Sequence, residues 1–120
     1  MPHLIVEFSD NLTGFPAKQI LAELNTAVIA SGQVQDETDL KSRTVRTSQF
    51  VIGANREASR GFVHAELRLL AGRTPEIKRD LSDRIAAVLR ELTPKPEGML
   101  VQLSVDIVDM DRSAYTKEKL

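Results

Sequence analysis

The strongest constraint on the fold is a strand–helix–strand pattern that occurs twice along the chain. Alternating apolar residues at 4–8, helical spacing over 16–31 and a strand-like segment over 40–52 form the first copy. Segments 62–69, 75–92 and 99–107 repeat the order. Right-handed crossovers place both helices on the same side of a sheet. The sequence therefore predicts an α/β (α+β) fold, β-α-β-β-α-β, with one four-stranded mixed sheet and two helices on one face.

The ends of the predicted helices carry recognisable signals. Pro16 suits the first turn of the first helix, and Gly32 suits a left-handed residue after its last turn. Thr74 is a candidate N-cap for the second helix, Pro75 occupies its favoured first position, and Pro94 stops it. The apolar stripes of the two helices are Ile20, Leu21, Leu24 and Val28, and Ile77, Leu81, Ile85, Val88 and Leu92.

Length and pattern together predict the organisation of the chain. Its 120 residues, 42% of them hydrophobic, are enough for one small core. We expect a single domain over 1–120, with pseudo-repeats 1–53 and 61–109 and a charged C-terminal tail over 110–120. The helices leave the other face of the sheet uncovered, and several residues of that face are apolar or β-branched. An oligomer that covers this face with other subunits is therefore expected.

Composition argues against several classes of partner. The 16 basic and 17 acidic residues nearly cancel, so we expect no nucleic acid and no anionic membrane as a partner. The chain has no cysteine and therefore no disulfide, thiolate nucleophile or zinc–cysteine site, which fits a reducing compartment. No apolar run approaches the ~20 residues that span a bilayer, and no leader pattern is present at the start. A cytoplasmic protein is the simplest expectation.

Pro2 is the first candidate for chemistry. A methionine before so small a residue is normally removed, which would make the nitrogen of Pro2 a secondary amine. An α-amino group has a pKa near ~8, and burial or a neighbouring cation lowers it toward a free base at neutral pH. Taken alone, however, a proline at this position more often only begins an edge strand.

Basic residues are the second set of candidates. Arg73 lies at a strand-to-helix turn, where its charge and the helix N-terminus would attract a carboxylate. Lys41 and Arg43 share one face of the third segment, and Arg46 lies on the other. Taken in isolation, each is more commonly a solvated surface cation.

Other constellations are not supported. The two histidines, His3 and His64, lack the spacing of a metal-ligand pair, so we expect no metal. Asp36, Glu37 and Asp39 are typical of a solvated turn. The chain has no Gly-rich phosphate loop and no Gly-x-Ser-x-Gly elbow, and no cofactor is expected.

Several segments together resemble a known family. They are the opening residues 1–11 (MPHLIVEFSDN), 41–43 (KSR), 62–64 (FVH), 71–73 (AGR) and the strand over 103–109. With these motifs the chain resembles the 5-carboxymethyl-2-hydroxymuconate Δ-isomerases of the tautomerase superfamily over nearly its whole length.

The resemblance implies a function and a site. It implies a homotrimer whose sheets form an inner barrel, with Pro2 as general base in a reaction without metal or cofactor. Arg73 would bind a substrate carboxylate and help to keep Pro2 neutral, and Lys41 and Arg43 would bind substrate. The substrate would be a small 2-hydroxymuconate-type carboxylate in the degradation of aromatic compounds. At residue 41 the family has arginine, and lysine keeps the charge but loses the two-pronged hydrogen bond.

Two alternatives remain open at this point. One is a broad phenylpyruvate-type tautomerase, which would share Pro2 but need fewer substrate carboxylates. The other is a non-catalytic trimeric binding protein with the same fold. The role of the charged tail is left open by both.

Overall fold

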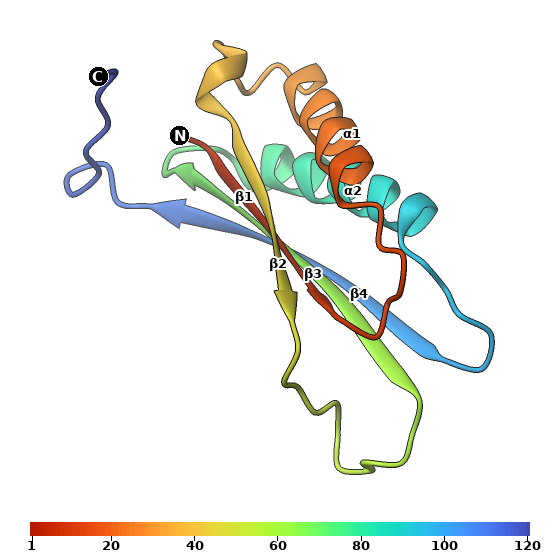
Figure 1. The fold of residues 1–120 in the computed structure, drawn as a ribbon. Helices are drawn as coiled ribbons and strands as arrows, with labels where there is room; N and C mark the ends of the chain where they lie inside the picture. Colours follow the sequence, from red (N-terminus) through yellow and green to blue (C-terminus); the bar gives the residue numbers. More distant parts are fainter.

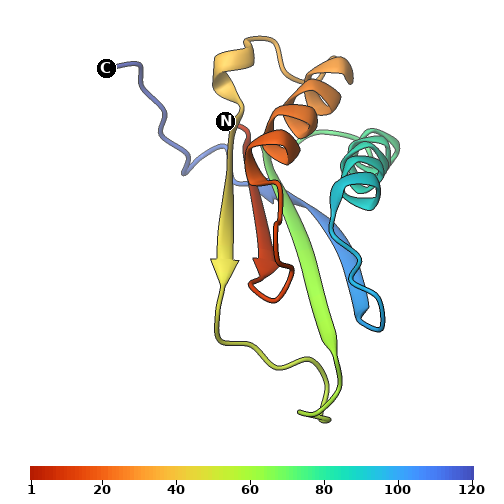
Figure 2. The ribbon, with the colours of Figure 1, turned by 45° about the vertical axis from the view of Figure 1, so that its right-hand side comes forward.

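The computed structural model describes residues 1–120 and contains one four-stranded sheet and two α-helices (Figure 1). Its elements are β1 (His3–Ser9), α1 (Ala17–Ala30), the short 3-10 helix η1 (Glu37–Asp39), β2 (Lys41–Thr47), β3 (Arg60–Leu70), α2 (Pro75–Leu92) and β4 (Leu100–Met110). The strand order is β2-β1-β3-β4. This arrangement confirms the predicted β-α-β-β-α-β fold, with both helices on one face of the sheet (Figure 2).

The strand directions bring four chain segments to one end of the sheet. β1 runs parallel to β2 and β3 runs parallel to β4, while β1 and β3 are antiparallel. The starts of β1 and β2 therefore lie beside the ends of β3 and β4. Figure 1 shows both chain termini at this end, opposite the long loop that joins β2 to β3.

The core lies between the helices and the sheet. Leu4, Val6 and Phe8 of β1 alternate inward, as predicted, and Val63 to Leu69 of β3 do the same. The fully buried helix residues are Ile20, Leu24 and Val28 of α1 and Leu81, Ile85 and Leu89 of α2. Leu89 completes the i, i+4, i+8 row that begins at Leu81, and it was missing from the predicted stripe.

The helix ends follow the sequence signals with one small difference. Thr74 caps α2 by accepting a hydrogen bond from the backbone N–H of Ile77, and Pro75 is the first residue of the helix. Gly32, after α1, has φ +81°, the left-handed conformation expected of it. Pro16 is the cap residue that precedes α1, so the helix begins one residue later than its signal suggested.

The strand predicted over 40–52 is shorter than expected. β2 covers only Lys41–Thr47, because its sole neighbour β1 ends at Ser9, the partner of Thr47. Beyond that point no strand offers further hydrogen bonds, and Val51 lies in the loop with 68% of its surface exposed. At the other end of the chain, β4 extends the predicted strand to Met110.

The face of the sheet away from the helices is open and largely polar. Strand alternation places His3, Ile5 and Glu7 of β1 there, beside His64 and Glu66 of β3. Hydrogen bonds cross it, including His64 Nδ1 with Ser104 Oγ at 2.7 Å. Apolar side chains also lie on this face, and two of them, Val45 and Leu100, are exposed in the single chain. Neither helix has the length and apolar character required to cross a membrane.

Candidate active site

A cavity of about 240 Å³ lies at the end of the sheet where the four segments meet. Pro2 precedes β1, Arg73 follows β3, and residues 33–35 follow α1. The lining residues are Met1, Pro2, Gln33, Val34, Gln35, Asp39, Leu69, Arg73 and Arg112. The cavity thus brings together Pro2 and Arg73, which are 71 positions apart in the sequence.

Pro2 is buried at this cavity and fixed to the neighbouring strand. Its carbonyl oxygen accepts a hydrogen bond from the backbone N–H of Lys41 at 3.1 Å, which begins the β1–β2 pairing. In the chain with Met1 attached, the nitrogen of Pro2 is an amide and cannot act as a base. Removal of Met1 would expose this nitrogen in the same cavity.

The surroundings of the N-terminus disfavour a protonated amine. The pKa of the Met1 amine is lowered from 8.0 to about 6, first by burial and then by the hydrogen-bond contact and the charge of the Lys41 side chain. Lys117 acts in the same direction, and the negative charge of Asp39 acts against it. The end of the sheet is therefore an environment in which an amine is largely unprotonated at neutral pH.

Arg73 is held in place by neutral groups only. Its Nη1 donates to the Leu70 carbonyl at 3.0 Å, its Nη2 to the Gln33 carbonyl at 3.2 Å, and its Nε to Gln33 Oε1 at 3.3 Å. These oxygens orient the guanidinium without neutralising its charge. The Arg73 charge is thus available for an anionic ligand.

Lys41 and Arg43 occupy different places, although both lie on the open face of β2. Lys41 lies beside the N-terminal amine, and its Nζ donates to the Asp39 carbonyl at 2.8 Å. Arg43 lies further along the strand, and its Nη1 donates to His3 Nδ1 at 3.3 Å. Neither Lys41 nor Arg43 is a lining residue of the cavity. Within one chain, the cavity is therefore reached by Pro2 and Arg73, with Lys41 near its edge and Arg43 apart from it.

Four polar residues of the cavity, Gln33, Gln35, Asp39 and Arg112, were not predicted to belong to the site. Gln33 positions Arg73, and Asp39 pairs with Lys117, whose hydrogen bond lowers the pKa of the Asp39 carboxyl. Arg112 lies after β4, in the tail whose role was left open. The predicted topology carried a usable signal, because it places the residues that follow β4 at the same end as Pro2.

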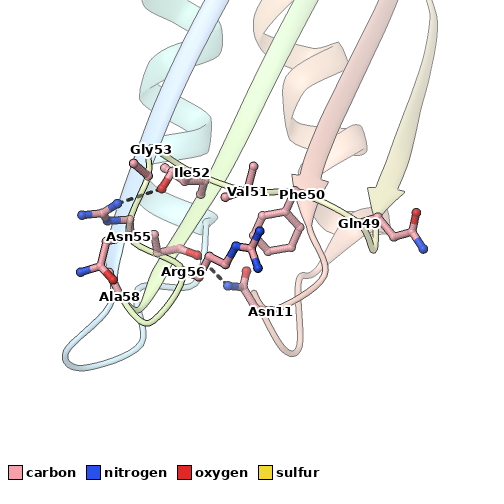
Figure 3. Close-up of a pocket in the computed structure, with 11 residues that line it drawn as sticks. Asn11, Gln49, Phe50, Val51, Ile52, Gly53, Asn55, Arg56 and Ala58 are labelled. Carbon is pink, nitrogen blue, oxygen red and sulfur yellow. Dashed lines mark hydrogen bonds between the residues drawn. The ribbon is translucent and has the colours of Figure 1, made fainter.

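A larger cavity, about 920 Å³, lies at the opposite end of the molecule (Figure 3). It is formed mainly by the loop between β2 and β3, and two hydrogen bonds of Arg60, the first residue of β3, join this loop and the segment after β1. Asn11 Nδ2 donates to the Arg60 carbonyl at 2.7 Å, and Arg60 Nη1 donates to the Ile52 carbonyl at 2.8 Å. Its polar side chains are amides and arginines, none of which serves as a base at neutral pH. The smaller cavity is therefore the better candidate for proton transfer.

No group of three or more histidine, cysteine, aspartate and glutamate side chains is arranged to hold a metal ion. The chemistry available at the smaller cavity is that of an amine, guanidinium groups and one carboxylate.

Comparisons with known proteins bear on the family and the fold of the chain. The model of a family described as 5-carboxymethyl-2-hydroxymuconate isomerase matches residues 2–119. A structure of a 5-carboxymethyl-2-hydroxymuconate isomerase from Deinococcus radiodurans R1 is 28% identical, with a TM-score of 0.90 over 99% of this chain and 90% of the other. A 5-carboxymethyl-2-hydroxymuconate delta-isomerase structure is 20% identical, with a TM-score of 0.82 over 100% and 88% of the two chains.

More distant similarity extends to a fused 4-OT described as a symmetric trimer. It is 18% identical, with a TM-score of 0.71 over 98% of this chain and 92% of that one, and shows the same fold. None of the curated proteins matches the sequence.

Proposed function

The chain belongs to the 5-carboxymethyl-2-hydroxymuconate isomerase family, and we propose that it ketonises a 2-hydroxymuconate-type carboxylate with the amine of Pro2 as general base. The family makes it an isomerase that interconverts keto and enol groups or shifts C=C bonds. Family membership thus favours an enzyme over the non-catalytic binding protein. The proposed site, substrate class and metabolic role in aromatic-compound degradation go beyond that membership.

One observation carries the proposal. The cavity at the end of the sheet combines a buried Pro2 with Arg73, whose charge has no carboxylate partner. A base that must be neutral and a cation that can hold an anionic substrate are thereby placed together. Lys41 and Lys117 add positive charge that lowers the pKa of the Met1 amine, and the same charges would oppose protonation of the Pro2 amine after Met1 is removed.

The proposed reaction is a proton transfer along a conjugated system. The Pro2 nitrogen takes the proton from the enol hydroxyl, so that the C–O bond becomes a carbonyl and the double bonds shift. The protonated amine then returns this proton to a carbon of the conjugated system, which regenerates the neutral base. Arg73 holds a substrate carboxylate during both steps, which fixes the distance between amine and carbon.

A broad phenylpyruvate-type tautomerase is the second candidate. It is favoured by the position of Arg43, which lies outside the cavity lining of its own chain. Without Arg43, fewer cations are available to bind substrate carboxylates. A substrate with a single carboxylate needs only Arg73. Both candidates depend on Pro2, and the relative rates with different carboxylates distinguish them.

We further propose a homotrimer in the cytoplasm. The open face of the sheet and the fused 4-OT trimer with the same fold support the assembly. In such a trimer, residues of a neighbouring chain could complete each cavity.

The test begins with the intact mass of the native protein, which should show that Met1 has been removed. Pro2→Ala should then lower kcat/KM for 2-hydroxymuconate and for phenylenolpyruvate by about 10²- to 10⁴-fold, the usual contribution of a positioned general base. Pro96→Ala, in the loop after α2, is the matched control and should keep wild-type kinetics. Retention of Met1, or unchanged rates for Pro2→Ala, would remove Pro2 from the mechanism.

A further inference from the structure

Arg112 lies against the same turn as Arg73 and comes from a different part of the chain. Its Nε donates to the Ala71 carbonyl at 2.6 Å. Its Nη2 lies 3.6 Å from the position that a Cβ would take on Gly72. The backbone of Ala71 and Gly72, the two residues before Arg73, therefore holds the Arg112 guanidinium in place.

The hydrogen bonds of Arg112 leave most of its donors free. Only Nε has a partner in the protein, so the two terminal nitrogens, Nη1 and Nη2, keep all their N–H groups available. A guanidinium held through Nε presents the paired donors with which arginine binds carboxylates. Arg112 is exposed and also lines the cavity, so a ligand in the cavity can reach its side chain.

Neither arginine of the cavity has an acidic partner. The structure contains six ion pairs, and they account for Lys78, Lys117 and Lys119 among the cations near this end of the molecule. Arg73 and Arg112 belong to none of them. Two like charges that share a cavity repel each other, and an anion that contacts both relieves that repulsion.

We propose that Arg112 is a second carboxylate-binding residue of this site and selects enols with two or more carboxylates over those with one. The proposal rests on the function proposed above and narrows its substrate class. Arg73 and Arg112 hold separate carboxylates of one substrate, and the Pro2 amine at the same cavity takes the proton of its enol hydroxyl. A substrate with a single carboxylate uses Arg73 and gains little from Arg112.

The test compares kcat/KM for 5-carboxymethyl-2-hydroxymuconate, which has three carboxylates, with that for phenylenolpyruvate, which has one. Arg112→Ala should lower kcat/KM about tenfold for the first, mainly through KM, and less than twofold for the second. Arg112→Lys should recover part of the loss, because it restores the charge without the paired donors. Arg90→Ala, an exposed arginine in the last turn of α2, is the matched control and should change neither.

The outcomes separate this inference from the proposed function. If the wild type is active and Arg112→Ala affects both substrates equally or neither, the role of Arg112 is wrong while the function stands. If the wild type turns over neither substrate, the function is wrong, and calorimetric binding of propane-1,2,3-tricarboxylate decides on Arg112. Equal affinity of wild type and Arg112→Ala for that compound would overturn the inference.

Discussion

At the scale of single residues, the N-terminus depends on charges supplied by other parts of the chain. Lys41 begins β2, Lys117 lies in the tail, and both lower the pKa of the terminal amine. The negative charge of Asp39 raises this pKa, and the ion pair of Asp39 with Lys117 weakens that effect. The protonation state of the amine is therefore set jointly by η1, β2 and the tail.

Lys41→Ala should move the acidic limb of the pH profile upward. Loss of this cation raises the pKa of the terminal amine, so a smaller fraction is unprotonated near pH 6 and activity falls most there. By about pH 8 to 9 the amine is unprotonated in both proteins, so the pH profiles of the variant and the wild type should run parallel there. The measurement is kcat/KM against pH, with Lys18→Ala in α1 as the control.

A role for Lys41 in substrate binding alone gives a different result. In that case kcat/KM falls by the same factor at every pH, and the limb stays where it is in the wild type. An unshifted limb would therefore contradict the effect of Lys41 on the amine.

Pro2 and Arg73 could be predicted as site residues from the sequence, but the cavity that they share could not. Arg73 was recognisable from its turn before a helix and from the family-like AGR segment. Arg112 had no such signal, because an arginine in a charged tail is typical of solvent-exposed chain. Its position depends on a hydrogen bond to Ala71, 41 residues away, which no local pattern encodes.

At the scale of elements, α2 connects the core to the site. Its first residue, Pro75, follows directly on the turn that carries Arg73, and its inner row of Leu81, Ile85 and Leu89 is fully buried. The start of this helix therefore fixes the backbone from which Arg73 extends. Thr74 defines that start through its hydrogen bond to Ile77.

Thr74→Ala should destabilise the protein by about 1 kcal/mol, because the N–H of Ile77 loses its cap. Thr74→Ser keeps the hydroxyl and should remain close to the wild type. The measurement is the free energy of unfolding from urea titration of both variants. Equal stabilities for the alanine and serine variants would show that the cap contributes nothing.

Element boundaries were predictable where local signals exist and failed where the neighbouring strand decides. The ends of α2 follow from Thr74, Pro75 and Pro94, all of which act on the adjacent backbone. The end of β2 does not, because residues up to Ile52 have suitable side chains and lack only a partner. The length of β1 limits β2, and this dependence is not visible within the segment itself.

At the scale of the whole molecule, the open face of the sheet decides how subunits would meet. It mixes Ile5 with ionisable residues such as His3, Glu7 and Glu66, and several of its polar groups already bond within the chain. A barrel of three such faces would bury polar groups together with apolar residues such as Val45 and Leu100, which are exposed in the single chain. Association in the proposed trimer should therefore be sensitive to a single added charge near Ile5.

Ile5→Lys should weaken the trimer, because it places three additional ammonium groups inside one closed assembly. Sedimentation velocity at micromolar concentration should show the wild type as a trimer and Ile5→Lys shifted toward the monomer. Ala22→Lys, on the exposed surface of α1, adds the same charge away from the sheet and should remain trimeric. Circular dichroism should show folded protein in all three cases, and a fully trimeric Ile5→Lys would place the subunit interface elsewhere.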